Sequence, residues 1–202
     1  IANKESIICG WNLIKKQLVI NKTILEPVDS EHFAIAQLLK IIDAKVIKNI
    51  YVTASGGPFL NKNLDKFKNI TVKSALKHPN WSMGKKISVD SATLVNKVFE
   101  IIECYRLFDI PMNKFKIIIH PQSFVHSIFF LNNGLSIALM HKPDMKIPIS
   151  ILLGLNNYNL GDIISLDNKN FYSNLSFSEV DKKKFPVVSL LDKILKRTSL
   201  ME

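Results

Sequence analysis

KNIYVTASGGP, residues 48–58, reads as a buried strand that runs directly into a loop. Its first half is rich in β-favouring side chains, and two glycines followed by a proline are typical of a turn. Apolar residues at helical spacing precede this strand in residues 4–19 and 33–42, and residues 117–120 form a second short apolar strand. This order of elements predicts an α/β fold class, with an α+β mixed sheet and flanking helices.

A β-hairpin is the clearest local prediction outside that strand. Residues 124–131 and 135–140 are strand-like, and Asn132-Asn133-Gly134 between them are residue types that accept positive φ at low cost. The other predicted segments, in chain order, are an extended run (23–28), an irregular stretch (60–69), a loop (78–86), a helix (91–108), a loop with a short helix (143–155), weak strands beyond residue 158 and a last helix within 182–196.

Composition excludes several classes of protein. The 202 residues are 47% hydrophobic, which is ample for a packed core, and the formal charge of +10 either attracts anions or reflects solvated surface lysines. We expect no nucleic-acid partner, because no arginine-rich stripe interleaved with aromatics occurs. We expect no membrane partner, because no apolar run reaches the roughly 18 residues that span a bilayer. Cys9 and Cys104 lie in apolar helical patterns and are predicted to be buried free thiols.

Three acidic residues are candidate metal ligands. Asp29 and Glu31 follow an extended run, where two carboxylates can hold a hard cation, although Asp29 or Ser30 could equally be the N-cap of the next helix. Glu100 shares a helix face with Asn96 and Lys97, which indicates either a functional group or an ordinary solvated stripe. The local pattern leaves both alternatives open.

Two loops are candidates for contact with an anionic ligand. Ser55-Gly56-Gly57 follows the strand and could hold a phosphate through its amides and hydroxyl, or could be a simple tight turn. The loop after His78 carries Trp81 and Met83, which either close over a ligand or insert into the core.

Longer strings resemble one known family, the reductoisomerases of the non-mevalonate isoprenoid pathway. The resemblance is continuous from residue 1 to about residue 155. Its motifs are ANKES (2–6), PVDSEH (27–32), SGGPF (55–59), HPNWSMG (78–84), KISVDSAT (86–93), NK with Glu100 (96–100), HPQS (120–123) and PDM (143–145).

The resemblance implies a reaction and a set of residue roles. Family members rearrange 1-deoxy-D-xylulose 5-phosphate and reduce the product with NADPH to 2-C-methyl-D-erythritol 4-phosphate. The implied metal ligands, for Mg²⁺ or Mn²⁺, are Asp29, Glu31 and Glu100, and the implied catalytic residues are Lys4 and Glu31. The implied substrate-binding residues are Ser30, Ser55, His78, Trp81, Met83, Ser91, Asn96 and Lys97. The implied cofactor-binding residues are Asn3, Lys4, Glu5 and Gly84.

The chain also departs from the family pattern. The family opens with a Rossmann-type NADPH domain that has no counterpart here, and the match fades after about residue 180. Val98 and Phe99 stand where the family helix usually has a glycine after its NK pair. We therefore expect a linking helix in residues 1–20, a catalytic domain in residues 21–157 and a connector with a truncated or divergent C-terminal region in residues 158–202.

The resemblance further implies a homodimer located in a bacterial cytoplasm or in a plastid-type, apicoplast-like organelle. Without an NADPH domain the chain is expected to hold the metal and turn over poorly. Three alternatives remain open: a truncated, non-catalytic remnant of the enzyme, a metal-dependent sugar phosphatase and, least favoured, a nucleic-acid module.

Overall fold

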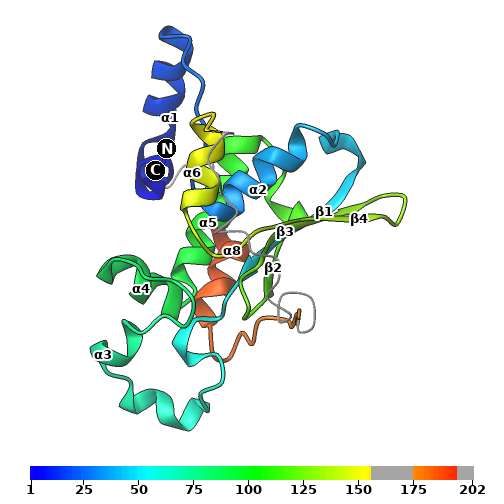
Figure 1. Cartoon of the computed structure of the whole chain (residues 1–202). Helices are drawn as coiled ribbons and strands as arrows, with labels where there is room; N and C mark the ends of the chain where they lie inside the picture. The colour runs from blue at the N-terminus through cyan, green and yellow to red at the C-terminus, as the bar shows by residue number, and fades with distance from the viewer. Residues whose placement is uncertain (156–174, 195–202) are drawn as a thin grey trace.

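A four-stranded mixed sheet organises the chain. The structure is a computed structural model that describes residues 1–155 and 175–194. Strand order is β2-β1-β3-β4, with β1 parallel to β2 and antiparallel to β3, and β3 antiparallel to β4 (Figure 1). The strands are β1 (Ile47–Ala54), β2 (Phe115–Ile119), β3 (Val125–Leu131) and β4 (Ser136–Met140). The predicted α/β class with a mixed sheet is confirmed, as is the strand that begins the opening motif.

The β3–β4 connection is the hairpin that the sequence predicts. Gly134 has φ +89°, a conformation that a glycine adopts without steric cost. The Asn133 side chain accepts a hydrogen bond from the Leu135 amide at 3.1 Å and closes the turn. The turn chemistry therefore sets the register, in which Phe130 pairs with Ser136.

The main core lies between one face of the sheet and two helices. Helix α2 (Ser30–Leu39) and helix α5 (Val95–Phe108) supply apolar side chains that pack against alternate positions of β1 and β3. Burying each such side chain is worth about 1.5–3 kcal/mol. The fully or nearly fully buried members are Ile35, Leu38, Ile47, Ile50, Val52, Ile101, Cys104, Ile110 and Phe129. This packing fixes the N-terminus of α2 beside the middle of α5.

Helix α1 (Lys4–Ile20) is bent at Gly10, whose φ and ψ of −121° and 21° are non-helical. Before the bend, Ile8 packs against Val98 of α5. Arg106 of α5 donates to the carbonyl of Ile7, at 2.6 Å, and to that of Ile8. Beyond the bend the helix projects away from the sheet (Figure 1). The first turns of α1, and not the whole helix, are therefore fastened to the core.

The cysteine prediction is half right. Cys104 is a buried free thiol in the main core, whereas Cys9 is a free but exposed thiol. Ile7 and Ile8 take the side of α1 that faces α5, so the next residue along the helix turns toward solvent.

The single helix predicted for residues 91–108 is wrong, because two helices meet there. Helix α4 (Lys85–Ala92) ends where the Thr93 hydroxyl donates to the Val89 carbonyl at 3.0 Å, and α5 starts afresh after Leu94. Leu94 has φ +61° but is 3% exposed, so burial of its side chain offsets an unfavourable backbone conformation. The predicted loop 78–86 is correspondingly shorter, because α4 already begins at Lys85.

Shorter elements complete the described chain. Residues 60–69 are less irregular than predicted, since Leu64–Asn69 is a 3-10 helix, and residues 23–28 pair with none of the strands that the structure describes. The last predicted helix begins later than residue 182, because Pro186 starts a 3-10 helix, and residues 195–196 of that prediction lie outside the described part. The weak strands predicted beyond residue 158 fall largely outside it too. The remaining short helices are Ala44–Val46, Gly57–Phe59, α3 (Val72–Ala75), Met112–Lys114, α6 (Lys146–Leu152), Pro186–Leu190 and α8 (Leu191–Ile194).

Within the described residues, no helix combines the length and apolar character needed to cross a membrane.

Candidate functional site: an acidic cluster and an adjoining cavity

Three helices bring charged side chains to one point in the interior. Asp29 caps α2 and accepts a long hydrogen bond, 3.4 Å, from the Glu31 amide. Glu100 lies on α5 and is only 1% exposed. The packing of α2 against α5 places one ligand atom from each of Asp29, Glu31 and Glu100 within 4.8 Å of the others. Asp29 is thus both a helix cap and a member of the cluster, while the solvated-stripe interpretation of Glu100 is wrong.

Two buried lysines neutralise part of this acidic charge. Lys4 Nζ, from the first turn of α1, lies 2.7 Å from Asp29 Oδ2 and 3.1 Å from Glu100 Oε1. Lys97 Nζ lies 3.2 Å from Glu31 Oε1 and also contacts Glu100 Oε2. Three carboxylates and two ammonium groups therefore alternate in a site where charges are costly unless paired.

The pKa values respond to this crowding. Burial disfavours both ammonium groups, but the neighbouring carboxylates outweigh it and raise the pKa of Lys4 and of Lys97 above their usual range. Burial and the carboxylates of Glu100 and Asp29 raise the pKa of Glu31 to about 8, against the attraction of Lys97. The positive charge of the two lysines is therefore too small to keep all three carboxylates of the cluster ionised.

This arrangement fits a divalent cation. Carboxylate oxygens are the ligands that Mg²⁺ and Mn²⁺ prefer, and the three acids provide them from two helices at one point. Added positive charge would relieve the repulsion that raises the pKa of Glu31.

A cavity of about 240 Å³ opens beside the cluster. It brings together all the predicted metal-binding and substrate-binding residues, together with Lys4. These are Lys4, Asp29, Ser30, Glu31, Ser55, His78, Trp81, Met83, Ser91, Asn96, Lys97 and Glu100. Residues separated by up to 96 positions in the chain therefore face one space.

The far wall of the cavity is a hydrogen-bonded loop. His78 Nδ1 lies 3.1 Å from the Asn80 amide and 3.0 Å from the Trp81 amide, and it must accept both hydrogen bonds. The proton of the neutral ring is then on Nε2, which lies 2.9 Å from Ser55 Oγ and donates to it. Ser55 Oγ also accepts from the Gly57 amide at 3.2 Å. The hydroxyl proton of Ser55 is left available for an anion.

Gly57 has to be glycine for a steric reason. Its φ is +64°, and a Cβ built on it would lie 3.0 Å from both the Ala92 Cα and the Ser91 carbonyl oxygen. The glycine lets the loop after β1 approach the end of α4 closely, so that Ser55 and Ser91 line the same cavity. A simple tight turn would not require that approach.

Three predicted cofactor-binding residues lie outside this cavity lining. Asn3 caps α1 by accepting from the Ser6 amide at 2.8 Å, Glu5 pairs with Lys86 at 2.6 Å, and Gly84 precedes the first turn of α4. Only the fourth of that set, Lys4, reaches the cavity.

Sequence reasoning missed several lining residues. His126 is buried in β3, its ring stacked on His141 with centroids 3.8 Å apart, and the Trp81 ring meets it edge-on at 6.5 Å. Ser123 and Met145 also line the cavity. His126 falls inside an apolar strand pattern, so only the rarity of a charged residue type there could have singled it out.

The fold and cavity define a class: an α/β domain that presents a carboxylate cluster and several hydrogen-bond donors to one ligand cavity.

Comparisons with known proteins identify the family that this chain resembles. A family model described as the 1-deoxy-D-xylulose 5-phosphate reductoisomerase C-terminal domain matches residues 25–108. Proteins named 1-deoxy-D-xylulose 5-phosphate reductoisomerase are similar to the chain. The one from Pelagibacter ubique is 51% identical over 100% of this chain and 52% of its own length. The one from the Wolbachia of Drosophila simulans is 45% identical over 96% of this chain and 50% of its own.

Solved structures agree with the sequence comparisons. A DOX-P reductoisomerase in complex with NADPH, fosmidomycin and magnesium superposes with a TM-score of 0.85 at 36% identity, over 97% of this chain and 50% of that one. The Zymomonas mobilis enzyme in complex with NADPH superposes with a TM-score of 0.78 at 34% identity, over 96% of this chain and 50% of that one. The chain is similar over its whole length to proteins named 1-deoxy-D-xylulose 5-phosphate reductoisomerase, and residues 25–108 match the model of their C-terminal domain. It spans about half the length of the curated relatives it matches.

Proposed function

We propose that this chain supplies the metal and substrate site for the NADPH-dependent conversion of 1-deoxy-D-xylulose 5-phosphate to 2-C-methyl-D-erythritol 4-phosphate. The observation that carries the proposal is the meeting of Asp29, Glu31 and Glu100 within 4.8 Å at the end of the cavity that also holds the predicted phosphate-binding side chains. The names of the relatives support the same reaction.

In this proposal Asp29, Glu31 and Glu100 hold Mg²⁺ or Mn²⁺. When bound, the cation would supply Lewis-acid polarisation of the substrate oxygens, and NADPH would supply hydride. A solved relative in complex with magnesium supports the choice of a hard cation. The same site leaves Lys4 with a second task, because its Nζ also lies 2.7 Å from Asn96 Oδ1 and borders the cavity. Lys4 is suited to donate a hydrogen bond to a substrate oxygen at the reacting end.

We assign the opposite end of the cavity to the substrate phosphate. Ser55 and Ser91 offer hydroxyl donors there, and Lys97, which also lines the cavity, offers a positive charge. Binding energy from a phosphate held at this end can position the reacting carbons without being part of the chemistry. Trp81 and Met83, on the loop above, would exclude water once the ligand is bound.

Asn3, Glu5 and Gly84 keep their predicted role as cofactor contacts. Glu5 and Gly84 lie near one another, because Glu5 pairs with Lys86 in the first turn of α4. These residues lie on α1 and α4, next to the cavity but outside its lining, where a cofactor provided with the rest of the enzyme could approach. In the same proposal α1 links an NADPH-binding domain to the catalytic domain, as in the predicted domain division.

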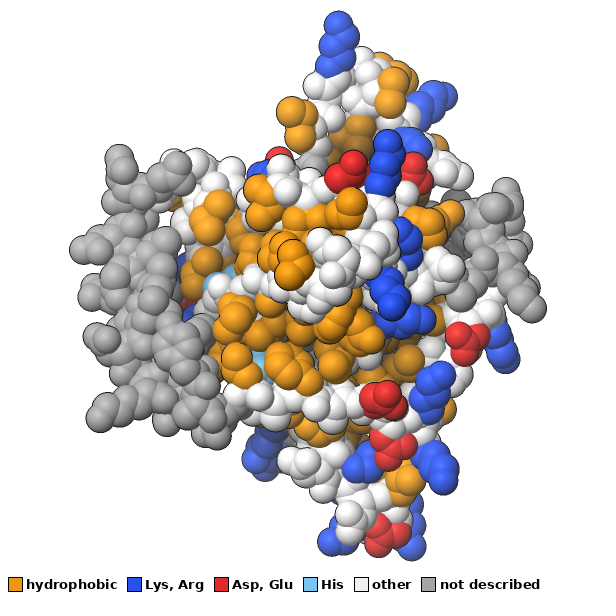
Figure 2. Space-filling view, turned by 90° about the vertical axis from the view of Figure 1, so that its right-hand side faces the viewer, with side chains coloured by type: hydrophobic (Ala, Val, Ile, Leu, Met, Phe, Trp, Pro, Cys, Tyr) orange, Lys and Arg blue, Asp and Glu red, His pale blue; other side chains and the backbone are white. Residues whose placement is uncertain are grey.

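We also propose that the protein forms a homodimer through the open face of the sheet. Tyr51 and Phe130 contact each other with ring centroids 4.9 Å apart on the face opposite the main core, and Phe130 is 38% exposed. On the side toward which the β3–β4 hairpin points, hydrophobic side chains gather over a broad area (Figure 2). We expect Phe130→Asp to shift the protein to a monomer in light-scattering measurements.

Similar relatives come from bacteria such as Pelagibacter and Wolbachia. We therefore favour a bacterial cytoplasm over a plastid-type organelle as the compartment.

A direct experiment follows NADPH oxidation with 1-deoxy-D-xylulose 5-phosphate and Mn²⁺, alongside phosphate release. We expect the chain on its own to oxidise NADPH only slowly, Glu100→Gln to abolish that activity, and no phosphate release from simple sugar phosphates; robust turnover would contradict the expectation that the chain alone turns over poorly. Metal-dependent phosphate release without NADPH oxidation would instead favour a sugar phosphatase. If Mn²⁺ does not bind, the chain is a non-catalytic remnant and the proposal fails.

A further inference from the structure

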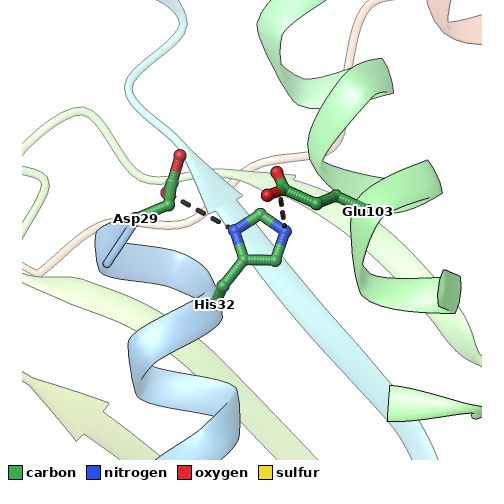
Figure 3. Close-up of side chains that lie close together, drawn as sticks. All are labelled: Asp29, His32 and Glu103. Atoms are coloured by element: carbon green, nitrogen blue, oxygen red, sulfur yellow. Dashed lines mark ion pairs between the residues drawn. The ribbon is translucent and has the colours of Figure 1, made fainter. Parts of the chain in front are cut away.

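A buried histidine lies directly behind the acidic cluster. The His32 ring, from α2, stands between the carboxylates of Asp29 and Glu103 (Figure 3). Its Nδ1 is 3.6 Å from Asp29 Oδ1, and its Nε2 is 3.3 Å from Glu103 Oε2. Nε2 also lies 3.0 Å from the backbone oxygen of Glu100. One fully buried side chain therefore touches the carboxylate of one candidate ligand and the backbone of another.

The geometry argues against His32 as a metal ligand of its own. Asp29, His32 and Glu103 do offer atoms within 4.8 Å of one another. The two carboxylates, however, face opposite nitrogens of the ring (Figure 3). An ion bound to either nitrogen would have the ring between it and one of the acids, so the three groups do not converge on a common point.

The two oxygens of Asp29 face different surroundings. Oδ2 lies 2.7 Å from Lys4 Nζ and is turned toward the cluster. Oδ1 is turned away from it, toward the Glu31 amide at 3.4 Å and the His32 ring. His32 Nδ1 and Glu103 Oε2 are both fully buried side-chain atoms without a hydrogen-bond partner in the described structure. Asp29 Oδ1, 3.6 Å away, is an acceptor that faces Nδ1 and needs to approach by only a few tenths of an ångström to form a hydrogen bond with it.

We propose that His32 is a positioning residue: its Nδ1 side fixes the rotation of the Asp29 carboxylate so that Oδ2 faces the cation, and Glu103 holds the ring from behind. The inference rests on the proposed metal site. Its physical basis is general, because groups that hold a metal ligand in orientation typically contribute a factor of about 10–100 in metal affinity. Glu103 itself does not line the cavity, so its contribution passes through His32.

A matched pair of substitutions separates orientation from packing. The amide of asparagine can place a donor near the position of Nδ1, whereas the longer glutamine places one near Nε2. We expect His32→Asn to keep Mn²⁺ affinity within a few-fold of wild type, and His32→Gln to lower it about 10–100-fold, as measured by calorimetry. A purely structural role predicts that affinity follows the thermal midpoint of each variant instead. Equal affinities for the two variants would overturn the proposal.

A second variant and a spectroscopic measurement keep the proposal testable even if the His32 variants fail to fold. Glu103→Ala removes the rear contact, and we expect it to lower Mn²⁺ affinity about 10-fold. Unchanged affinity in that variant would also count against the proposal. Pulsed electron paramagnetic resonance of the Mn²⁺ complex should show no directly coordinated imidazole nitrogen, while such a nitrogen would make His32 a ligand and overturn the positioning role. If the wild-type protein binds no Mn²⁺, the proposed metal site is wrong. That outcome is distinct from the failure of the positioning role of His32, in which the wild-type protein binds Mn²⁺ and the variants bind it equally well.

Discussion

The two ends of the cavity are built in opposite ways. The acidic end consists of side chains on α1, α2 and α5 that are packed into the interior, and Lys4, Lys97 and Glu100 are each 6% exposed or less. The loop end, residues 78–84, is half-buried or exposed, and Asn80 anchors it by donating to the Pro121 carbonyl at 2.5 Å and to Ser123 Oγ at 2.7 Å. The acidic end is therefore arranged before any ligand arrives, whereas the loop end depends on a few hydrogen bonds.

The largest expected effect comes from removing a carboxylate at the acidic end. We expect Glu100→Gln to reduce Mn²⁺ affinity at least about 100-fold and to abolish turnover, because a ligand is lost and Lys4 and Lys97 lose a shared partner. Unfolding in urea without metal should show a loss of about 3–5 kcal/mol, the usual cost of breaking a buried ion pair. The exposed acid Glu179 provides the control: Glu179→Gln should change neither quantity.

Removing a lysine at the same end should have an effect that depends on metal. We expect Lys97→Met to destabilise the metal-free protein by about 3 kcal/mol, because Glu31 and Glu100 then repel each other without that cation. Saturating Mn²⁺ should recover more stability in this variant than in wild type. Equal recovery in both proteins would mean that the ion does not bind among these carboxylates.

The loop end should respond to acid through His78. Burial lowers the pKa of His78, so the folded loop favours the neutral ring. A base with a lowered pKa contributes stability that is complete above its unfolded value near 6.5 and is lost as the pH falls through the folded pKa. Protonation at Nδ1 would also break the hydrogen bonds from Asn80 and Trp81. In a Trp11→Phe background, Trp81 fluorescence should change between about pH 7 and pH 5, and His78→Asn should remove that change.

The smallest effect is expected from the loop's aromatic side chain. We expect Trp81→Ala to raise the KM for the sugar phosphate about 10-fold, with Mn²⁺ affinity unchanged, because the side chain covers the cavity and touches none of the acids. A loss of metal affinity as large as that of Glu100→Gln would show that the two ends are not separate.

Much of the fold is readable from sequence because the signals are local. The opening strand, the Asn133-Gly134 hairpin and the helix that begins at Asp29 follow from side-chain pattern and turn chemistry. The break at Leu94 does not, because a buried leucine with positive φ gives no local signal and depends on the tertiary packing around it.

The site was less readable from local pattern. The local pattern leaves open whether Asp29 is a helix cap or a metal ligand and whether Glu100 is a surface group or a ligand, and only the resemblance to the family groups the two acids. The structure places them within 4.8 Å because α2 and α5 pack on one face of the sheet, which is information that no short window contains. His126 and Glu103 were not predicted as site residues for the same reason. Each lies in an apolar stretch, and its partners come from distant parts of the chain.

The position of a bound Mn²⁺ tests the central claim most directly. Crystals of the protein soaked in Mn²⁺ can be measured for anomalous diffraction. We predict one strong peak among the side chains of Asp29, Glu31 and Glu100, at oxygen-ligand distances of about 2.0–2.3 Å, and its loss in Glu100→Gln. A strong peak elsewhere, or none at saturating Mn²⁺, would contradict the account.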